Sequence, residues 1–67
     1  MEVRVGRMPG PLNLYAVEEG STVKNVLKLA QVNSKGFRIE VNDDVAELND
    51  EVSDGDTILL TKSVQGN

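Results

Sequence analysis

The side chains that most often carry catalysis and metal binding are unevenly represented in this 67-residue sequence. It contains no Cys and no His, which removes the thiolate nucleophile, the commonest general base and the commonest metal ligand. Carboxylates remain. The segment from Glu40 to Asp56 holds eight acidic residues and no Lys or Arg. These carboxylates are the first candidates for a metal site or for general acid and base chemistry.

Neither role fits the spacing of the carboxylates. Asp50 and Asp54 match positions 1 and 5 of a calcium-binding loop, but position 3 would be Val52 and the required Glu at position 12 would be Thr61. The adjacent carboxylates at 43 and 44 lie in a predicted turn with no nucleophile near them in the sequence. We therefore predict surface turns, no metal site, no catalytic residue and no cofactor, and a protein that is not an enzyme.

The net charge of the protein limits the kind of partner that it can bind. Seven basic and 11 acidic residues give a net charge of -4, which disfavours nucleic acid and anionic membranes and favours a partner with a basic surface. No stretch approaches the ~20 apolar residues of a membrane span, and the first residues do not resemble a signal peptide. We expect a cytoplasmic monomer that binds another protein.

A DNA-binding, antitoxin-like hairpin protein is an alternative of another class, because such chains also end in a Gly-Asp-x-hydrophobic strand. The acidic balance and the central helix disfavour it. The basic residues also make no obvious stripe along the sequence. They are Arg4, Arg7, Lys24, Lys28, Lys35, Arg38 and Lys62.

Alternating apolar residues predict the strands that would position the charged side chains. Residues 1–8 and 12–18 form a predicted antiparallel hairpin around Pro9-Gly10-Pro11, and the alternation does not decide which face of 12–18 is buried. Further strands are predicted over 37–41 and 57–62, with Ile58 and Leu60 inward and Leu59 outward. Residues 45–52 are expected to hold a short strand and a loop.

One segment carries a helical pattern. An apolar stripe at i, i+3, i+4 and i+7 comprises Val23, Val26, Leu27 and Ala30. Ser21-Thr22 can cap its start. The spacing predicts a helix of about 11 residues that ends near Val32 or Asn33, with Gly36 supplying the left-handed stop.

A single amphipathic helix of this length needs a sheet to cover its stripe. The order β-β-α-β-(β)-β therefore predicts an α+β fold of the β-grasp (ubiquitin-like) type, a mixed four- to five-stranded sheet with one helix packed across one face. We expect residues 1–62 to form this domain and residues 63–67 to form a flexible C-terminal tail.

The segments 17–23, 41–43 and 54–60 together resemble the sulfur-carrier group of ubiquitin-like proteins, which includes the thiamine sulfur carrier and the small subunit of molybdopterin synthase. Residues 17–23 (VEEGSTV) resemble the group's strand, acidic-Gly turn and capped helix start. Residues 41–43 (VND) resemble its V-N-G turn, with Asp43 where Gly is usual. Residues 54–60 (DGDTILL) resemble its D-G-D-x-V approach to the last strand.

The resemblance implies a role for the tail. In that family a C-terminal Val-x-Gly-Gly is adenylated by an E1-like partner and then converted to a thiocarboxylate or joined to a protein amine. Here the corresponding residues are Val64, Gln65, Gly66 and Asn67, so Asn67 replaces the final Gly. The chain is then a non-catalytic binding module, or a true carrier or modifier whose partner accepts or removes Asn67, or only a superficial likeness.

A docking surface is predicted on the sheet face away from the helix. If Tyr15 and Val17 face the helix, apolar side chains of the neighbouring strands gather on the open face near two arginines, and such groups favour protein binding. The predicted docking residues are Arg4, Leu14, Ala16, Arg38 and Leu59. We expect the partner to be an E1-like adenylating enzyme or a cofactor-synthesis enzyme.

Overall fold

The computed structural model of the protein describes residues 1–62, and the predicted tail at 63–67 lies outside the described residues. Its elements, in chain order, are β1 (Glu2–Met8), β2 (Leu12–Ala16), α1 (Val23–Leu29), β3 (Phe37–Val41), β4 (Asp44–Val45) and β5 (Thr57–Lys62). This order confirms the predicted succession of elements. The two-residue β4 starts at Asp44, in the predicted turn, and only its second residue, Val45, lies in the segment 45–52 for which a short strand is predicted.

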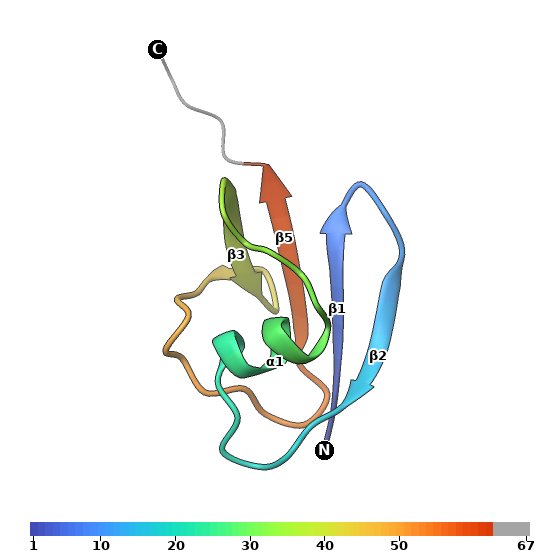
Figure 1. Ribbon diagram of the computed structural model, residues 1–67, viewed down its shortest axis with the longest axis vertical. Coiled ribbons are helices and arrows are strands. Elements are labelled where there is room, and N and C mark those ends of the chain that lie inside the picture. Colours follow the sequence, from blue (N-terminus) through green and yellow to red (C-terminus); the bar gives the residue numbers. More distant parts are fainter. Residues whose placement is uncertain (63–67) are drawn as a thin grey trace.

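The strands form one mixed sheet in the order β2-β1-β5-β3-β4. The two central strands, β1 and β5, are parallel to each other, and the other neighbours are antiparallel. The helix α1 lies across one face of this sheet (Figure 1). The predicted β-grasp, ubiquitin-like fold is confirmed.

The core lies between α1 and the central strands. The helical stripe is buried as predicted at Val23, Val26 and Leu27, while Ala30 is half-buried at its end. The strands contribute Val3, Val5, Ile39, Ile58 and Leu60, and the loop before β5 contributes Val52. Each such side chain stabilises the fold by roughly 1.5–3 kcal/mol when it leaves water completely.

The helix begins where the sequence predicts. Thr22 is the N-cap: its hydroxyl accepts a hydrogen bond from the backbone N–H of Asn25 (3.3 Å), and the Asn25 side-chain oxygen accepts one from the backbone N–H of Thr22 (3.0 Å). This reciprocal capping box satisfies two amides that have no partner inside the helix.

The predicted end of the helix is wrong. The helix ends at Leu29 with Ala30 as C-cap, and Gln31, not Gly36, takes the left-handed conformation (φ 59°). The N–H of Val32 donates to the Leu27 carbonyl (3.0 Å), which is the hydrogen bond of a Schellman motif. The chain turns early because this motif returns Val32 to the core. Gly36 has φ 83° in the turn before β3.

A polar network joins the turn between β3 and β4 to the start of β5. Asn42 (φ 52°) and Asp43 (φ 74°) form the two-residue turn of this hairpin. The Asn42 side-chain amide donates to the Asp56 carboxylate (2.8 Å), and its oxygen accepts from the N–H of Thr57 (3.0 Å). Two of the segments that resemble the sulfur carriers, residues 41–43 and 54–60, therefore form one structure.

Candidate docking surface

The register of the hairpin decides which side chains of β2 face away from the helix. Val3, which is buried in the core, pairs with Tyr15, and Arg4 pairs with Leu14. Because successive side chains of a strand point to opposite faces, Tyr15 lies on the helix side and Leu14 and Ala16 lie on the other. Tyr15 is half-buried against the core, as this assignment requires.

The other predicted docking residues lie on the same face. Leu59 pairs with Gly6 on one side and with Glu40 on the other, and Arg38 pairs with Thr61. These residues alternate with the buried Ile39, Ile58 and Leu60. The structure thus brings Arg4, Leu14, Ala16, Arg38 and Leu59 together on the sheet face opposite α1, which we call the open face.

Further apolar side chains belong to the open face. Leu12 (45% exposed) and Met8 (54% exposed) lie beside Leu14 (57% exposed) and the half-buried Leu59. We call these four residues the apolar patch. The same two-residue alternation that selected Leu14 could have found Leu12, two positions earlier. Val45 (69% exposed) pairs with Glu40, and no sequence periodicity marks it because β4 is only two residues long.

Gly6 lies within the apolar patch. A Cβ placed on Gly6 would come within 2.5 Å of the Pro11 carbonyl oxygen and 2.7 Å of Leu12 Cδ2. Only a glycine therefore lets the turn before β2 close over β1. Because Gly6 has no side chain, Leu12 packs directly against β1 at this position. Leu12 on β2 and Leu59 on β5 both pair with Gly6, one from each side.

Charged side chains border the apolar patch. The Arg38 guanidinium forms an ion pair with the Glu40 carboxylate at 3.0 Å, and the two side chains are 58% and 17% exposed. Such an exposed pair stabilises a fold by about 0–1 kcal/mol, so it bears more on the choice of partner than on stability. Arg4 is exposed on β1, between Leu14 and Thr57.

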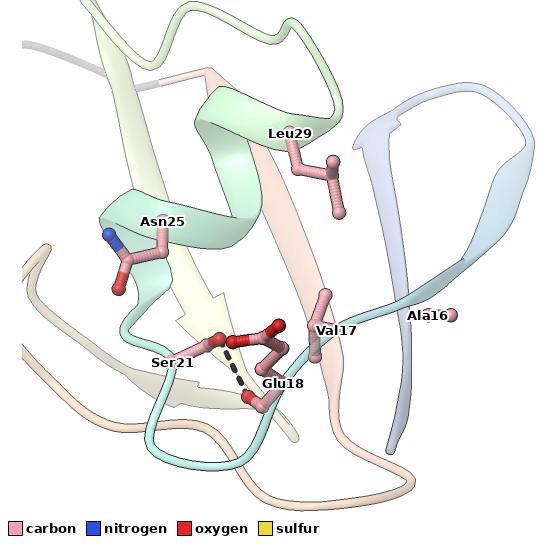
Figure 2. Close-up of a pocket in the computed structure, with 6 residues that line it drawn as sticks. All are labelled: Ala16, Val17, Glu18, Ser21, Asn25 and Leu29. Carbon is pink, nitrogen blue, oxygen red and sulfur yellow. Dashed lines mark hydrogen bonds between the residues drawn. The ribbon is translucent and has the colours of Figure 1, made fainter.

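A hollow of about 480 Å³ lies between the end of β2 and the helix (Figure 2). The residues that line it are Ala16, Val17, Glu18, Ser21, Asn25 and Leu29. The Ser21 hydroxyl donates to the Glu18 carbonyl oxygen at 2.6 Å, as the dashed line in Figure 2 shows. The Ser21 hydroxyl donates to this backbone carbonyl and not to the Glu18 carboxylate, the one possible base among the lining residues, so the hollow has no hydrogen-bonded pair of nucleophile and base.

Within residues 1–62, no group of three or more acidic side chains is arranged to hold a metal ion. In the same residues, no helix has the length and apolar character needed to cross a membrane. The predicted tail residues Val64, Gln65, Gly66 and Asn67 lie outside the described part of the chain.

Comparison with known proteins gives a family match over most of the chain. The model of the ThiS family matches residues 9–66. A comparison with curated protein sequences gives no match.

Several solved structures are similar to this chain, three of them as follows. SAMP1 from Haloferax volcanii has a TM-score of 0.78 at 15% identity, with 100% of each chain covered. A chain in the complex of subunits 1 and 2 of the molybdopterin-converting factor from Helicobacter pylori 26695 has a TM-score of 0.70 at 24% identity, again with 100% of each chain covered. A ubiquitin-like protein from Caldiarchaeum subterraneum has a TM-score of 0.61 at 17% identity, with 98% of this chain and 100% of that chain covered. At these identities the likeness shows the ubiquitin-like fold.

Proposed function

Because the chain belongs to the ThiS family of small ubiquitin-like sulfur carriers, we propose that it works without catalysing a reaction itself, by docking its open face and residues 63–67 on a partner enzyme. The partner is an E1-like adenylating enzyme or a cofactor-synthesis enzyme. The open face supplies the contact area, and the tail enters the partner.

The observation that carries this proposal is the apolar patch. Three of its four side chains are 45–57% exposed, and the strand register places all four on one face. The core does not need these side chains, because they lie on the opposite side of the sheet from α1. Exposed apolar groups bordered by charge are typical of protein-binding sites. The Arg38–Glu40 pair and Arg4 supply the charged border.

A protein partner also fits the similar structures. The chain from Helicobacter pylori was solved as a protein–protein complex of two molybdopterin-converting factor subunits. By analogy, a second protein would cover the open face of this chain. The net charge of -4 makes a nucleic-acid partner unfavourable.

The docking proposal is tested by titrating the purified chain into an E1-like adenylating enzyme from the same genome, with heat release as the signal. We expect saturable binding, and weaker binding for Leu59→Ser, because the hydroxyl would be buried against an apolar partner surface. Thermal unfolding of Leu59→Ser shows whether the variant is still folded. A folded Leu59→Ser chain that binds as tightly as the native chain would exclude the open face as the contact.

A second function is carried by the family match, which extends to Gly66. In this version the chain is a true sulfur carrier or protein modifier, and its C-terminal carboxylate attacks ATP, forms an acyl-adenylate and releases pyrophosphate. A sulfur donor then displaces AMP to leave a thiocarboxylate. Asn67 is accepted by the partner or removed to expose Gly66.

Intact mass spectrometry distinguishes the two versions. The native chain and an Asn67→Gly variant are each incubated with ATP, the E1-like enzyme and a sulfur donor. Adenylation, or exchange of one carboxylate oxygen for sulfur, in the native chain supports the carrier. Modification of Asn67→Gly alone supports a docking module that has lost carrier chemistry. If neither chain changes mass, the carrier function is excluded for this enzyme.

A further inference from the structure

The fold separates charges that are mixed along the sequence. Seven of the 11 acidic residues lie at the end of the sheet where β1 and β5 begin and β2 and β3 finish. Glu2 and Asp54 are joined there, because the Glu2 N–H donates to the Asp54 carboxylate at 2.7 Å. The acidic end comprises Glu2, Glu18, Glu19, Asp43, Asp44, Asp54 and Asp56.

Basic residues gather at the opposite end of the sheet. Arg7 pairs with Leu60 and Arg38 with Thr61, both near the end of β5, and Lys62 is the last residue of that strand. Lys35 lies in the turn that leads into β3. We call Arg7, Lys35, Arg38 and Lys62 the basic collar. In Figure 1, β1 and β5 both point toward this end, away from the N-terminus.

An aromatic ring organises part of the basic collar. The Arg7 guanidinium carbon lies 5.7 Å from the centre of the Phe37 ring, a cation–π distance. Lys62 pairs directly with Phe37 across the sheet. Arg7, Lys35, Arg38 and Lys62 are all exposed. Within residues 1–62 the one ion pair in the collar is that of Arg38 with Glu40, so most of its positive charge is available to a partner.

The two ends act as separate electrostatic surfaces. From Thr57 to Lys62 the strand β5 spans about 17 Å at ~3.3 Å per residue. The Debye length at physiological ionic strength is about 8 Å. The acidic end therefore does not cancel the field at the collar, although the whole chain carries a charge of -4.

We propose that the basic collar docks on an acidic surface of the protein partner. This surface is a ring of Asp and Glu side chains around the entrance of the channel in which the partner binds residues 63–67. The inference rests on the proposed function and adds the chemistry of the partner's contact surface. The acidic end is repelled by such a surface, so the charge separation orients the chain with its tail toward the partner. The net charge of -4 alone favours a basic partner surface, whereas the local positive charge of the collar favours an acidic one at the point of contact.

The position of the collar favours protein carboxylates over nucleotide phosphates as its partner groups. Residues 63–67 in extended form span at most about 18 Å. A nucleotide that reacts with the carboxylate beyond them lies too far from Lys62 to touch the collar when the tail is extended. The groups that face the collar are therefore those at the mouth of the tail-binding channel.

The chemistry of the collar is tested with a hexaglutamate peptide titrated into the ¹⁵N-labelled chain. We expect amide shifts concentrated in residues 7, 35–38 and 60–62, weakened by added salt. Lys62→Glu should weaken peptide binding roughly 3- to 10-fold, because an attraction becomes a repulsion. The matched control is Lys24→Glu, an exposed position on α1 that changes the net charge by the same amount. Shifts spread evenly over the chain, or equal weakening by both variants, would overturn the proposal.

The same two variants separate this inference from the proposed function. With the E1-like enzyme, Lys62→Glu should slow association and flatten its salt dependence, whereas Lys24→Glu should not. If the enzyme binds through the open face and Lys62→Glu has no effect on association, the collar inference fails and the docking function stands. If the peptide maps to the collar but the enzyme does not bind, the acidic-partner chemistry is supported and the enzyme is excluded.

Discussion

Leu14 allows the docking face to be tested with a control of the same residue type. Leu14 on the open face is 57% exposed, and Leu29 on the helix is 56% exposed. We expect Leu14→Ser to weaken binding to the partner and Leu29→Ser to leave it unchanged. Because both side chains are already largely in water, neither substitution should change the free energy of unfolding by more than about 0.5 kcal/mol.

The size of the effect follows from the exposure of Leu14. Moving a whole Leu side chain out of water contributes roughly 1.5–3 kcal/mol. Docking covers only the exposed share, and Ser adds a hydroxyl that loses its water, so the loss should be about 1–2 kcal/mol. That loss corresponds to roughly a 5- to 30-fold rise in Kd.

The assay is calorimetric titration of each variant into the E1-like enzyme, with thermal unfolding measured in parallel. A rise in Kd for Leu14→Ser alone confirms the open face. An equal rise for both variants would refute the reasoning, since it would mean that general loss of apolar surface, and not the face that Leu14 occupies, governs binding. A rise for Leu29→Ser alone would place the contact on the helix side.

Four further predictions concern stability and are checked by thermal or denaturant unfolding. Gly6→Ala should destabilise the fold by about 1–3 kcal/mol, because the new methyl group meets the Pro11 carbonyl at 2.5 Å; an unchanged midpoint would show that the turn does not close over β1. Asp43→Gly should stabilise it by up to about 1 kcal/mol, because Asp43 has φ 74° and glycine tolerates this conformation, and a loss of stability would contradict the assigned turn. Gln31→Gly should also stabilise the fold, because Gln31 has φ 59° and glycine tolerates this conformation. Gly36→Ala should destabilise the fold by about 1 kcal/mol, because Gly36 has φ 83°, although the space around it is open.

Local periodicity was sufficient to predict most of the fold. Residues 37–41 and 57–62 are strands with the predicted bounds, and Val23, Val26 and Leu27 form the buried stripe. The end of the helix was not predictable in this way. A Schellman turn usually has glycine at its left-handed position, and Gln31 carries no such signal, so the pattern of apolar residues extended the helix to Val32.

Long-range pairing determined the features of the site that the sequence left open. Alternation over residues 12–18 is equally apolar on both sides, and only the pairing of Val3 with Tyr15 assigns Leu14 to the open face. The parallel pairing of β1 with β5 joins segments more than 50 residues apart, and it places Leu59 beside Gly6. The basic collar depends on the same pairings, because its members are dispersed in the sequence and meet only at one end of the sheet.

The position of β5 in the middle of the sheet has a consequence for biosynthesis. Until residues 57–62 have left the ribosome, the nascent chain has one hairpin from β1 and β2 and another from β3 and β4, with no strand between them. Val5 and Ile39 then lack their cross-strand neighbours Ile58 and Leu60, so the hydrophobic core is incomplete. A chain that lacks β5 therefore cannot form this sheet, so the segment after Lys62 is joined to a folded domain only once β5 has paired with β1 and β3.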